Sequence, residues 1–176
     1  MLKAIKVSGI IIAILVLLPF LVGCSSSKNN NTPTPTEIPT VMPTATPSTL
    51  SVEAAGAAYL EYVIPINAAQ KAFSAKLSQW TDDTTSSQME EDTQPYITAC
   101  MEFNTKLQTT NWPSVAQADV RTLTNDIGQE VALLMTISTL NFLNVDTWLQ
   151  SFANALNTVS VDVGWVRHDL GLPPAQ

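Results

Sequence analysis

An uninterrupted apolar seam near the C-terminus is the feature that most constrains the fold. From residue 145 to residue 170, apolar side chains recur at alternating steps of four and three. This heptad spacing places all of them on one face of a helix. It is typical of helices that pack side by side in a bundle at a small crossing angle. The seam comprises Val145, Leu149, Phe152, Leu156, Val159, Val163, Val166 and Leu170.

The residues after the seam predict where this helix ends. Gly171 follows the last seam residue directly and precedes Leu172 and Pro173. Glycine adopts the left-handed conformation that caps many helices, and proline cannot continue a helix beyond that point. We therefore predict that the helix begins near Val145 and stops at Leu170.

Three earlier segments also carry apolar side chains at helical spacing. They predict helices over residues 51–79, 92–108 and 113–139. Four such helices joined by short connections favour an antiparallel up-down-up-down four-helix bundle. The predicted fold class is therefore all-α, with the bundle over residues 51–172 and a short tail over residues 173–176.

Polar residues support the predicted helix starts. Ser51 and Asp92 each provide a side-chain oxygen that can accept from the first free backbone N–H groups. Ser114 and Gln117 have the spacing of a capping box, which predicts that the third helix starts at or just before Ser114. Pro65 lies inside the first helix, where it removes one backbone donor and is expected to kink the helix.

The first residues resemble the signal peptide of a bacterial lipoprotein. Two lysines precede an almost entirely apolar run over residues 7–22, which is shorter than the roughly 20 residues that span a membrane. The tetrad Leu21-Val22-Gly23-Cys24 is similar to a lipobox, in which the chain is cut before a cysteine that carries acyl chains. The resemblance implies a signal peptide over residues 1–23 and a lipid on Cys24. The alternative, an uncleaved anchor helix, also places the domain outside the cell.

Residues 24–50 are predicted to form a disordered linker. They are rich in Ser, Asn, Thr and Pro and contain few apolar residues, so they cannot bury enough surface to order themselves. The prolines favour an extended path of about 3.1 Å per residue, or up to about 80 Å in all. We interpret the linker as a spacer between the lipid on Cys24 and the bundle.

Short motifs within the domain carry a second resemblance. They are Trp112-Pro113, Asp119-Val120 and the run from Val166 to Pro173. Over residues 52–174 the chain is similar to a broad group of alanine-rich helical lipoproteins of Gram-positive-type bacteria. The resemblance implies a helical bundle and an exported location, and it implies no activity.

Charge and reactive residues exclude several function classes. The chain has 8 basic and 15 acidic residues, so it cannot build the basic face that nucleic acid requires. His168 is the only histidine, and we expect it to complement the dipole at a helix end rather than to bind a metal. Cys100 lies on an apolar stripe and is expected to be a buried, inert thiol. We therefore predict no catalytic residue, metal or cofactor, and a protein that is not an enzyme.

The bundle topology predicts an acidic tip at the end farthest from the membrane anchor. A loop over residues 81–91 should meet the turn before the fourth helix at this end. Tryptophan side chains beside both connections would lie near the loop carboxylates. The candidate interaction residues are Trp80, Asp82, Asp83, Glu90, Glu91 and Trp148. A solvated acidic loop over tryptophans that close the bundle is the simpler interpretation.

Two functional hypotheses remain open. The first is an interaction module of the cell envelope, held at the extracytoplasmic face of the cell membrane by acyl groups on Cys24, that binds another envelope protein or a cell-wall component. The alternative is a small-ligand receptor with a pocket between helices near Pro65. In that case Asn67 and Asn157, both near mid-height of the bundle, would supply polar contacts.

Overall fold

The structure, a computed structural model, describes residues 48–140 and 144–175. The predicted signal peptide, Cys24 and most of the predicted linker lie outside this part of the chain. The described residues form four α-helices and a 3-10 helix, η1, that continues the third of them, without any strand. The predicted all-α fold is therefore confirmed. The elements are α1 (Val52–Leu77), α2 (Ser86–Thr109), α3 (Gln117–Leu134), η1 (Met135–Thr139) and α4 (Val145–Asp169).

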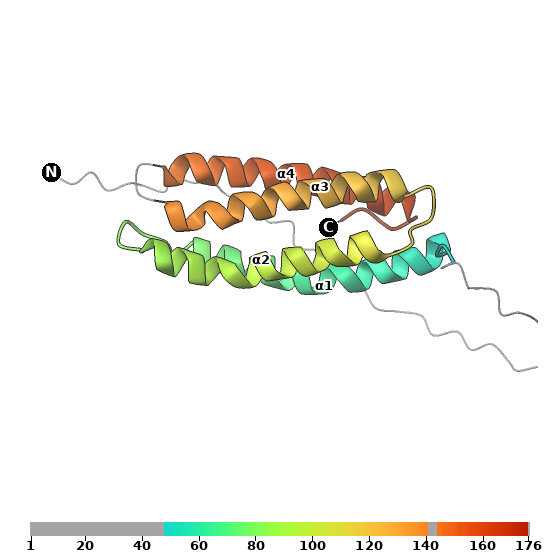
Figure 1. The fold of residues 1–176 in the computed structure, drawn as a ribbon, viewed down its shortest axis with the longest axis horizontal. Coiled ribbons are helices and arrows are strands. Elements are labelled where there is room, and N and C mark those ends of the chain that lie inside the picture. Colours follow the sequence, from blue (N-terminus) through green and yellow to red (C-terminus); the bar gives the residue numbers. More distant parts are fainter. Residues whose placement is uncertain (1–47, 141–143, 176) are drawn as a thin grey trace, which may run out of the picture.

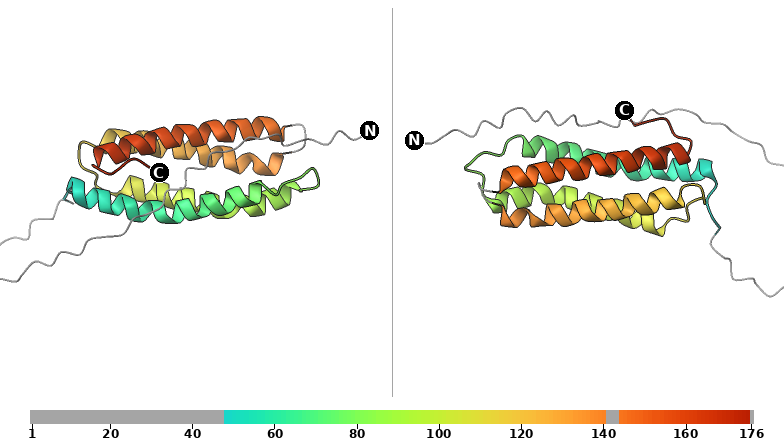
Figure 2. Two further views of the ribbon diagram at one scale, coloured as in Figure 1. Left: turned by 180° about the vertical axis from the view of Figure 1, so that it is seen from behind. Right: turned by 90° about the horizontal axis from the view of Figure 1, so that it is seen from above.

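The helices form two hairpins that lie one on the other. Figure 1 shows α3 and α4 in one layer and α1 and α2 in the other, with successive helices running in opposite directions. The closest packing is between α3 and α4, between α1 and α2, and between α2 and α3. Both views in Figure 2 place the start of α1 at the same end of the bundle as the end of α4.

The predicted start of α1 and the predicted end of α4 are confirmed by capping interactions, whereas α1 ends at Leu77, two residues before its predicted end. Ser51 Oγ accepts from the N–H of Ala54 at 3.2 Å, so Ser51 is the N-cap of α1. At the end of α4, Gly171 has φ +65°. Its N–H donates to the carbonyl of His168, and the N–H of Leu172 donates to the carbonyl of Arg167 at 2.8 Å. These two bonds form the Schellman motif, which a left-handed glycine makes possible.

The C-terminal turn also closes the bundle against α1. Gly56 is buried on α1, and a Cβ atom added there would lie 3.3 Å from Leu172 Cδ2. Glycine at position 56 therefore lets α1 approach the chain that leaves α4. On the other side of the same end, the N–H of Leu50 donates to the carbonyl of Asn111 at 2.9 Å. Leu50, which we predicted to belong to the linker, is therefore bonded to the helical bundle.

The predicted start of α2 was wrong by six residues. The helix begins at Ser86 rather than at Asp92, because Thr85 and Gln88 form a capping box. Thr85 Oγ1 accepts from the N–H of Gln88 at 3.3 Å, and Gln88 Oε1 accepts from the N–H of Thr85 at 3.1 Å. These reciprocal bonds satisfy two of the free donors at the helix start. Pro95 is consequently an interior residue of α2.

The predicted capping box at the start of α3 was also wrong. The helix begins at Gln117, and Ser114 is exposed. The N–H of Ala116 donates to the carbonyl of Pro113 at 2.9 Å, which makes a separate turn before the helix. The Gln117 side chain reaches back to the carbonyl of Trp112 at 3.0 Å. This bond occupies the side chain that the capping box would have used.

The apolar stripes of the four helices meet in one core. On α4 the predicted seam faces inward, since Phe152, Val166 and Leu170 are buried and the other seam residues are partly buried against the core. Aromatic rings join the layers at one end of the core. Phe73 of α1 stacks on Tyr96 of α2 at 5.5 Å and meets Phe152 of α4 edge-on at 5.7 Å. These contacts link both hairpins.

Candidate functional site

The two tryptophans of the predicted tip meet at the end of the bundle. The rings of Trp80 and Trp148 are 6.4 Å apart, and Trp148 also stacks on Phe152 at 5.3 Å. Trp148 is only 5% exposed, and its Nε1 donates to the carbonyl of Leu133 at 3.1 Å. Trp80 Nε1 donates to Asp92 Oδ2 at 3.1 Å. The rings therefore close the end of the core, and little of Trp148 is left for a partner to contact.

The predicted acidic residues of the tip fall into two groups. Asp82 and Asp83 are exposed in the connection between α1 and α2. Glu90 and Glu91, which we placed in the same loop, instead lie on the exposed side of α2 because that helix starts at Ser86. They border a shallow, open depression on α2 whose lining residues are Ser87, Glu90, Glu91, Gln94, Pro95 and Thr98.

The residues of the predicted polar pocket differ in burial. Asn67 is half-buried on α1, whereas Asn157 is exposed on α4. Pro65 is exposed inside a continuous α1. Within residues 48–140 and 144–175, no hydrogen bond involves either asparagine side chain. The described contacts therefore do not bring these residues together around a ligand.

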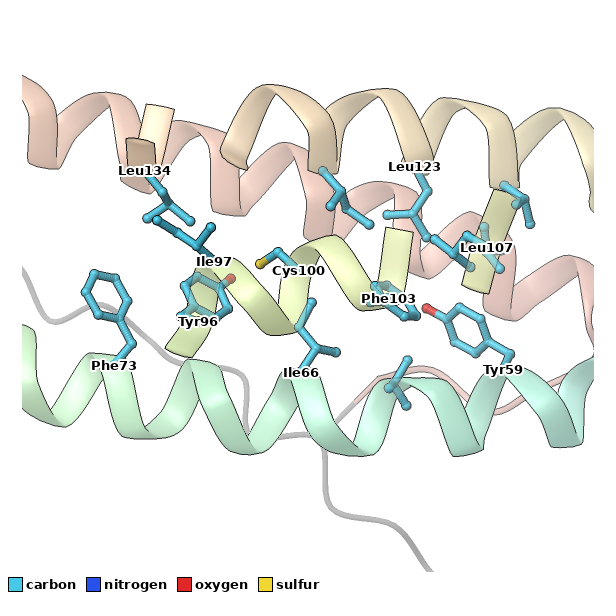
Figure 3. Close-up of a cluster of buried hydrophobic side chains, with 14 of the residues drawn as sticks. Tyr59, Ile66, Phe73, Tyr96, Ile97, Cys100, Phe103, Leu107, Leu123 and Leu134 are labelled. Atoms are coloured by element: carbon cyan, nitrogen blue, oxygen red, sulfur yellow. The ribbon is translucent and has the colours of Figure 1, made fainter. Parts of the chain in front are cut away.

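The core contains a buried polar group that the sequence did not single out. Tyr96 Oη donates to Glu130 Oε1 at 2.6 Å, and Glu130 is 1% exposed. Cys100 lies beside both residues on the next turn of α2, and Figure 3 shows Tyr96 and Cys100 entering the core together. Burial raises the pKa of Glu130, and the hydrogen bond from Tyr96 opposes this effect.

The environment of Cys100 confirms that its thiol is buried and makes it a poor nucleophile. Burial raises the pKa of Cys100, and the nearby negative charge of Glu130 raises it further. A thiol with a raised pKa contributes little thiolate, which is the reactive form. Cys100 also has no solvent-exposed surface. Tyr96, Cys100 and Glu130 are therefore buried members of the core.

A second polar group lies along the packed faces of α3 and α4. The neighbouring carboxyl of Asp126 raises the pKa of Asp162, and the neighbouring carboxyl of Asp169 raises the pKa of Asp119. His168 Nδ1 lies 3.3 Å from Asp169 Oδ1. Burial raises the pKa of Asp162 to about 6, and the carboxyls of Asp126 and Asp119 add to the shift. The sequence showed these acids only as scattered charges.

The outer face of α4 carries an exposed aromatic side chain between these carboxyl pairs. Trp165 is 57% exposed, and Val161, one turn earlier, is 52% exposed. Trp165 lies three residues after Asp162 and four residues before Asp169, spacings that place the three side chains along one side of the helix. We did not predict this site, because Trp165 is outside the apolar seam. The available signal was that a tryptophan outside the apolar seam of its helix is expected to be exposed to solvent.

No group of three or more His, Cys, Asp or Glu side chains is arranged to hold a metal ion in the part of the chain that the structure describes. Among the same residues, no helix is both long and apolar enough to cross a bilayer. The chain matches no protein-family model, no curated protein and no solved structure.

Proposed function

We propose that this chain is a lipid-anchored protein of the extracytoplasmic membrane face whose helical bundle binds another component of the cell envelope. Cys24 supplies the anchor, the linker lifts the bundle from the membrane, and α4 supplies the binding surface. Because the bundle joins the linker at the start of α1, its other end and its sides are free to meet a partner.

One observation carries the choice of surface, namely the exposure of Trp165. Tryptophan is the residue type most enriched among side chains that dominate protein interfaces. The other tryptophans that were candidates for contact pack against the core at the bundle end. Trp165 instead presents more than half of its surface to solvent and has Val161 beside it. Carboxylates on either side would form a polar rim around this apolar centre.

The anchor is tested by replacing Cys24 in the native host. Cys24→Ser keeps the signal peptide but removes the sulfur that would carry the lipid, so we expect the protein to move from the membrane fraction to the soluble fraction or the medium. A single acyl chain holds a protein only weakly, and stable anchoring needs two. Because Cys24→Ser would lack all of the acyl chains, its release from the membrane fraction should be close to complete. Cys100→Ser is the matched control and should stay with the membrane. An unchanged distribution of Cys24→Ser would contradict the lipid anchor.

The binding surface is tested by photo-crosslinking from α4 in intact cells. A photoreactive phenylalanine analogue at position 165 should yield a discrete adduct of higher mass, because the side chain points into solvent where a partner would sit. The same analogue at Gln150, which is exposed on α4 away from Trp165, is the control and should yield little or none. Mass spectrometry of the adduct identifies the partner. Equal adducts from both positions, or none from 165, would count against this surface.

A further inference from the structure

Asp162 occupies an unusual environment for a carboxyl group. Its side chain lies between α4 and α3, and the residue is only 8% exposed. Its Oδ2 atom is buried and has no hydrogen-bond donor among the described residues. A buried acceptor without a donor destabilises the fold, and it does so more strongly when it is charged. Asp162 must therefore obtain a donor or remain an unfavourable buried charge.

The nearest candidate donor is another carboxyl group. Asp126 lies on α3, the helix that packs most closely on α4, and it is the neighbouring carboxyl that raises the pKa of Asp162. Two ionised carboxylates side by side offer four acceptor oxygens and no donor. One proton placed between them turns one group into a donor and removes one of the two charges. The pair therefore holds together in the singly protonated form and repels in the fully ionised form.

The pairing is repeated once along the same interface. Asp119 and Asp126 are seven residues apart on α3, and Asp162 and Asp169 are seven apart on α4. Because the two helices are antiparallel and close-packed, Asp119 meets Asp169 two turns from the first pair. Burial raises the pKa of Asp119, and Asp169 raises it further. The two pairs form what we call the carboxyl ladder (Asp119–Asp169 and Asp126–Asp162).

The charged groups around Asp162 do not neutralise it. On α3 they are Asp126 and Asp119, and both act to raise the pKa of Asp162. On α4 the next charged groups are Asp169 and the exposed His168. Arg167 is turned away, since its Nε donates to the carbonyl of Pro173 at 2.8 Å. Among the described helices, α4 packs most extensively against α3, so these two helices supply the immediate surroundings of Asp162.

We propose that the carboxyl ladder is a proton-sensitive latch that holds α4 against α3 when Asp126 and Asp162 share a proton and loosens when both are ionised. Trp165 lies on α4 between the two pairs, so the latch controls the order of the surface that we assign to partner binding. This link to binding rests on the proposed function. The effect of protons on the α3–α4 contact does not, because it needs no partner.

The direction of the effect follows from the chemistry of the pair. The folded state binds a proton that the unfolded chain releases near the ordinary aspartate pKa of about 3.9. Since the pKa of Asp162 is raised to about 6, this contribution to stability is present at low pH and is lost as the pH rises toward and through 6. With a pKa of about 3.9 in the opened chain and about 6 in the folded state, Asp162 makes local opening roughly tenfold more frequent at pH 7.5 than at pH 5.

Hydrogen exchange measured by mass spectrometry tests the latch in the full chain, purified in a mild non-ionic detergent. After correction for the intrinsic effect of pH on exchange, peptides from α3 and α4 around Asp126 and Asp162 should open about tenfold more at pH 7.5 than at pH 5. In Asp126→Asn, the new amide can donate to Asp162 without a shared proton. This ratio should then fall to about twofold or less, and Asp162→Asn should reduce it likewise.

A control variant and the exchange ratio of the wild-type protein complete the test. Glu102→Gln removes an exposed carboxyl on α2 and should leave the wild-type ratio unchanged. If the Asn variants fail to fold, a wild-type ratio near one still overturns the latch, and so does a ratio that disappears in Glu130→Gln, because Glu130 on α3 also has a raised pKa. A wild-type ratio that survives in both Asn variants would assign the pH effect to other groups and also overturn it. Loss of crosslinking from position 165 with an intact ratio would refute the proposed function and leave the latch standing.

Discussion

Replacing Trp112 with alanine should lower the free energy of unfolding by about 3–5 kcal/mol, the largest loss we expect from any single change in the bundle. The indole is buried at the junction of α2 and α3. It meets the ring of Tyr59 edge-on at 6.5 Å and the ring of Tyr62 at 6.4 Å, both from α1. Truncation would therefore leave a cavity that separates α1 from the turn joining the two hairpins.

The loss of Trp112 would also remove a hydrogen bond. Trp112 Nε1 donates to the carbonyl of Leu107 at 2.6 Å, which is near the end of α2. Without the indole this carbonyl loses a buried partner, at a cost of about 1–3 kcal/mol within the expected total. Trp112→Phe should be intermediate, because it restores part of the ring but not the N–H group.

Urea unfolding followed by far-UV circular dichroism measures this effect. Trp165→Ala is the matched control, since it removes the same side chain from a position that is 57% exposed. A surface substitution of this kind changes stability by no more than about 0.5 kcal/mol. Similar losses in the two variants would mean that Trp112 does not join the hairpins or that Trp165 is not a surface residue. Trp165→Ala also provides a folded protein for binding assays.

The sequence predicted the all-α fold because its two clearest signals, the heptad seam and the glycine that follows it at position 171, depend only on interactions between residues close together in the chain. A seam over many turns specifies one face, and a glycine after it specifies a cap, whatever the rest of the chain does. The starts of α2 and α3 were harder to predict, because several polar residues near each start could serve as caps. At α2 the Thr85–Gln88 box extended the helix before Asp92. At α3 the Pro113 turn prevented Ser114 from serving as the cap.

The candidate sites were predicted less well than the fold, for a different physical reason. Trp80 and Trp148 pack on Phe73 and Phe152 and close the core, as the simpler interpretation of the tip expected, so they do not form an open interaction surface. The importance of Glu130 and Asp162 depends on which residues face them across helix interfaces. That information resides in the registry of α2 with α3 and of α3 with α4. Spacing within one helix shows only that Asp162 and Asp169 are seven residues apart, not which carboxyls they meet.

The second large effect concerns Glu130, whose replacement with alanine should lower the free energy of unfolding by about 2–4 kcal/mol. The change leaves a cavity in the core and removes the acceptor of the Tyr96 hydroxyl. Tyr96 is itself only 2% exposed, so water cannot easily replace that acceptor. Glu102→Ala, at an exposed position on α2, should change stability by no more than about 0.5 kcal/mol. A double-mutant cycle with Tyr96→Phe separates the two causes, because the hydrogen-bond part of the loss should disappear when the hydroxyl is already absent.

Glu130→Gln then distinguishes the shape of the side chain from its charge. The glutamine oxygen can accept from Tyr96 as the carboxyl does, so at pH 5 the variant should lie within about 1 kcal/mol of the wild type. Because burial raises the pKa of Glu130, the wild type loses stability as the pH rises through that value, whereas glutamine does not titrate. The variant should therefore be at least as stable as the wild type at pH 8. If Glu130→Gln were instead much less stable than the wild type at pH 8, the ionised carboxylate would be the form that stabilises the core, in conflict with the raised pKa.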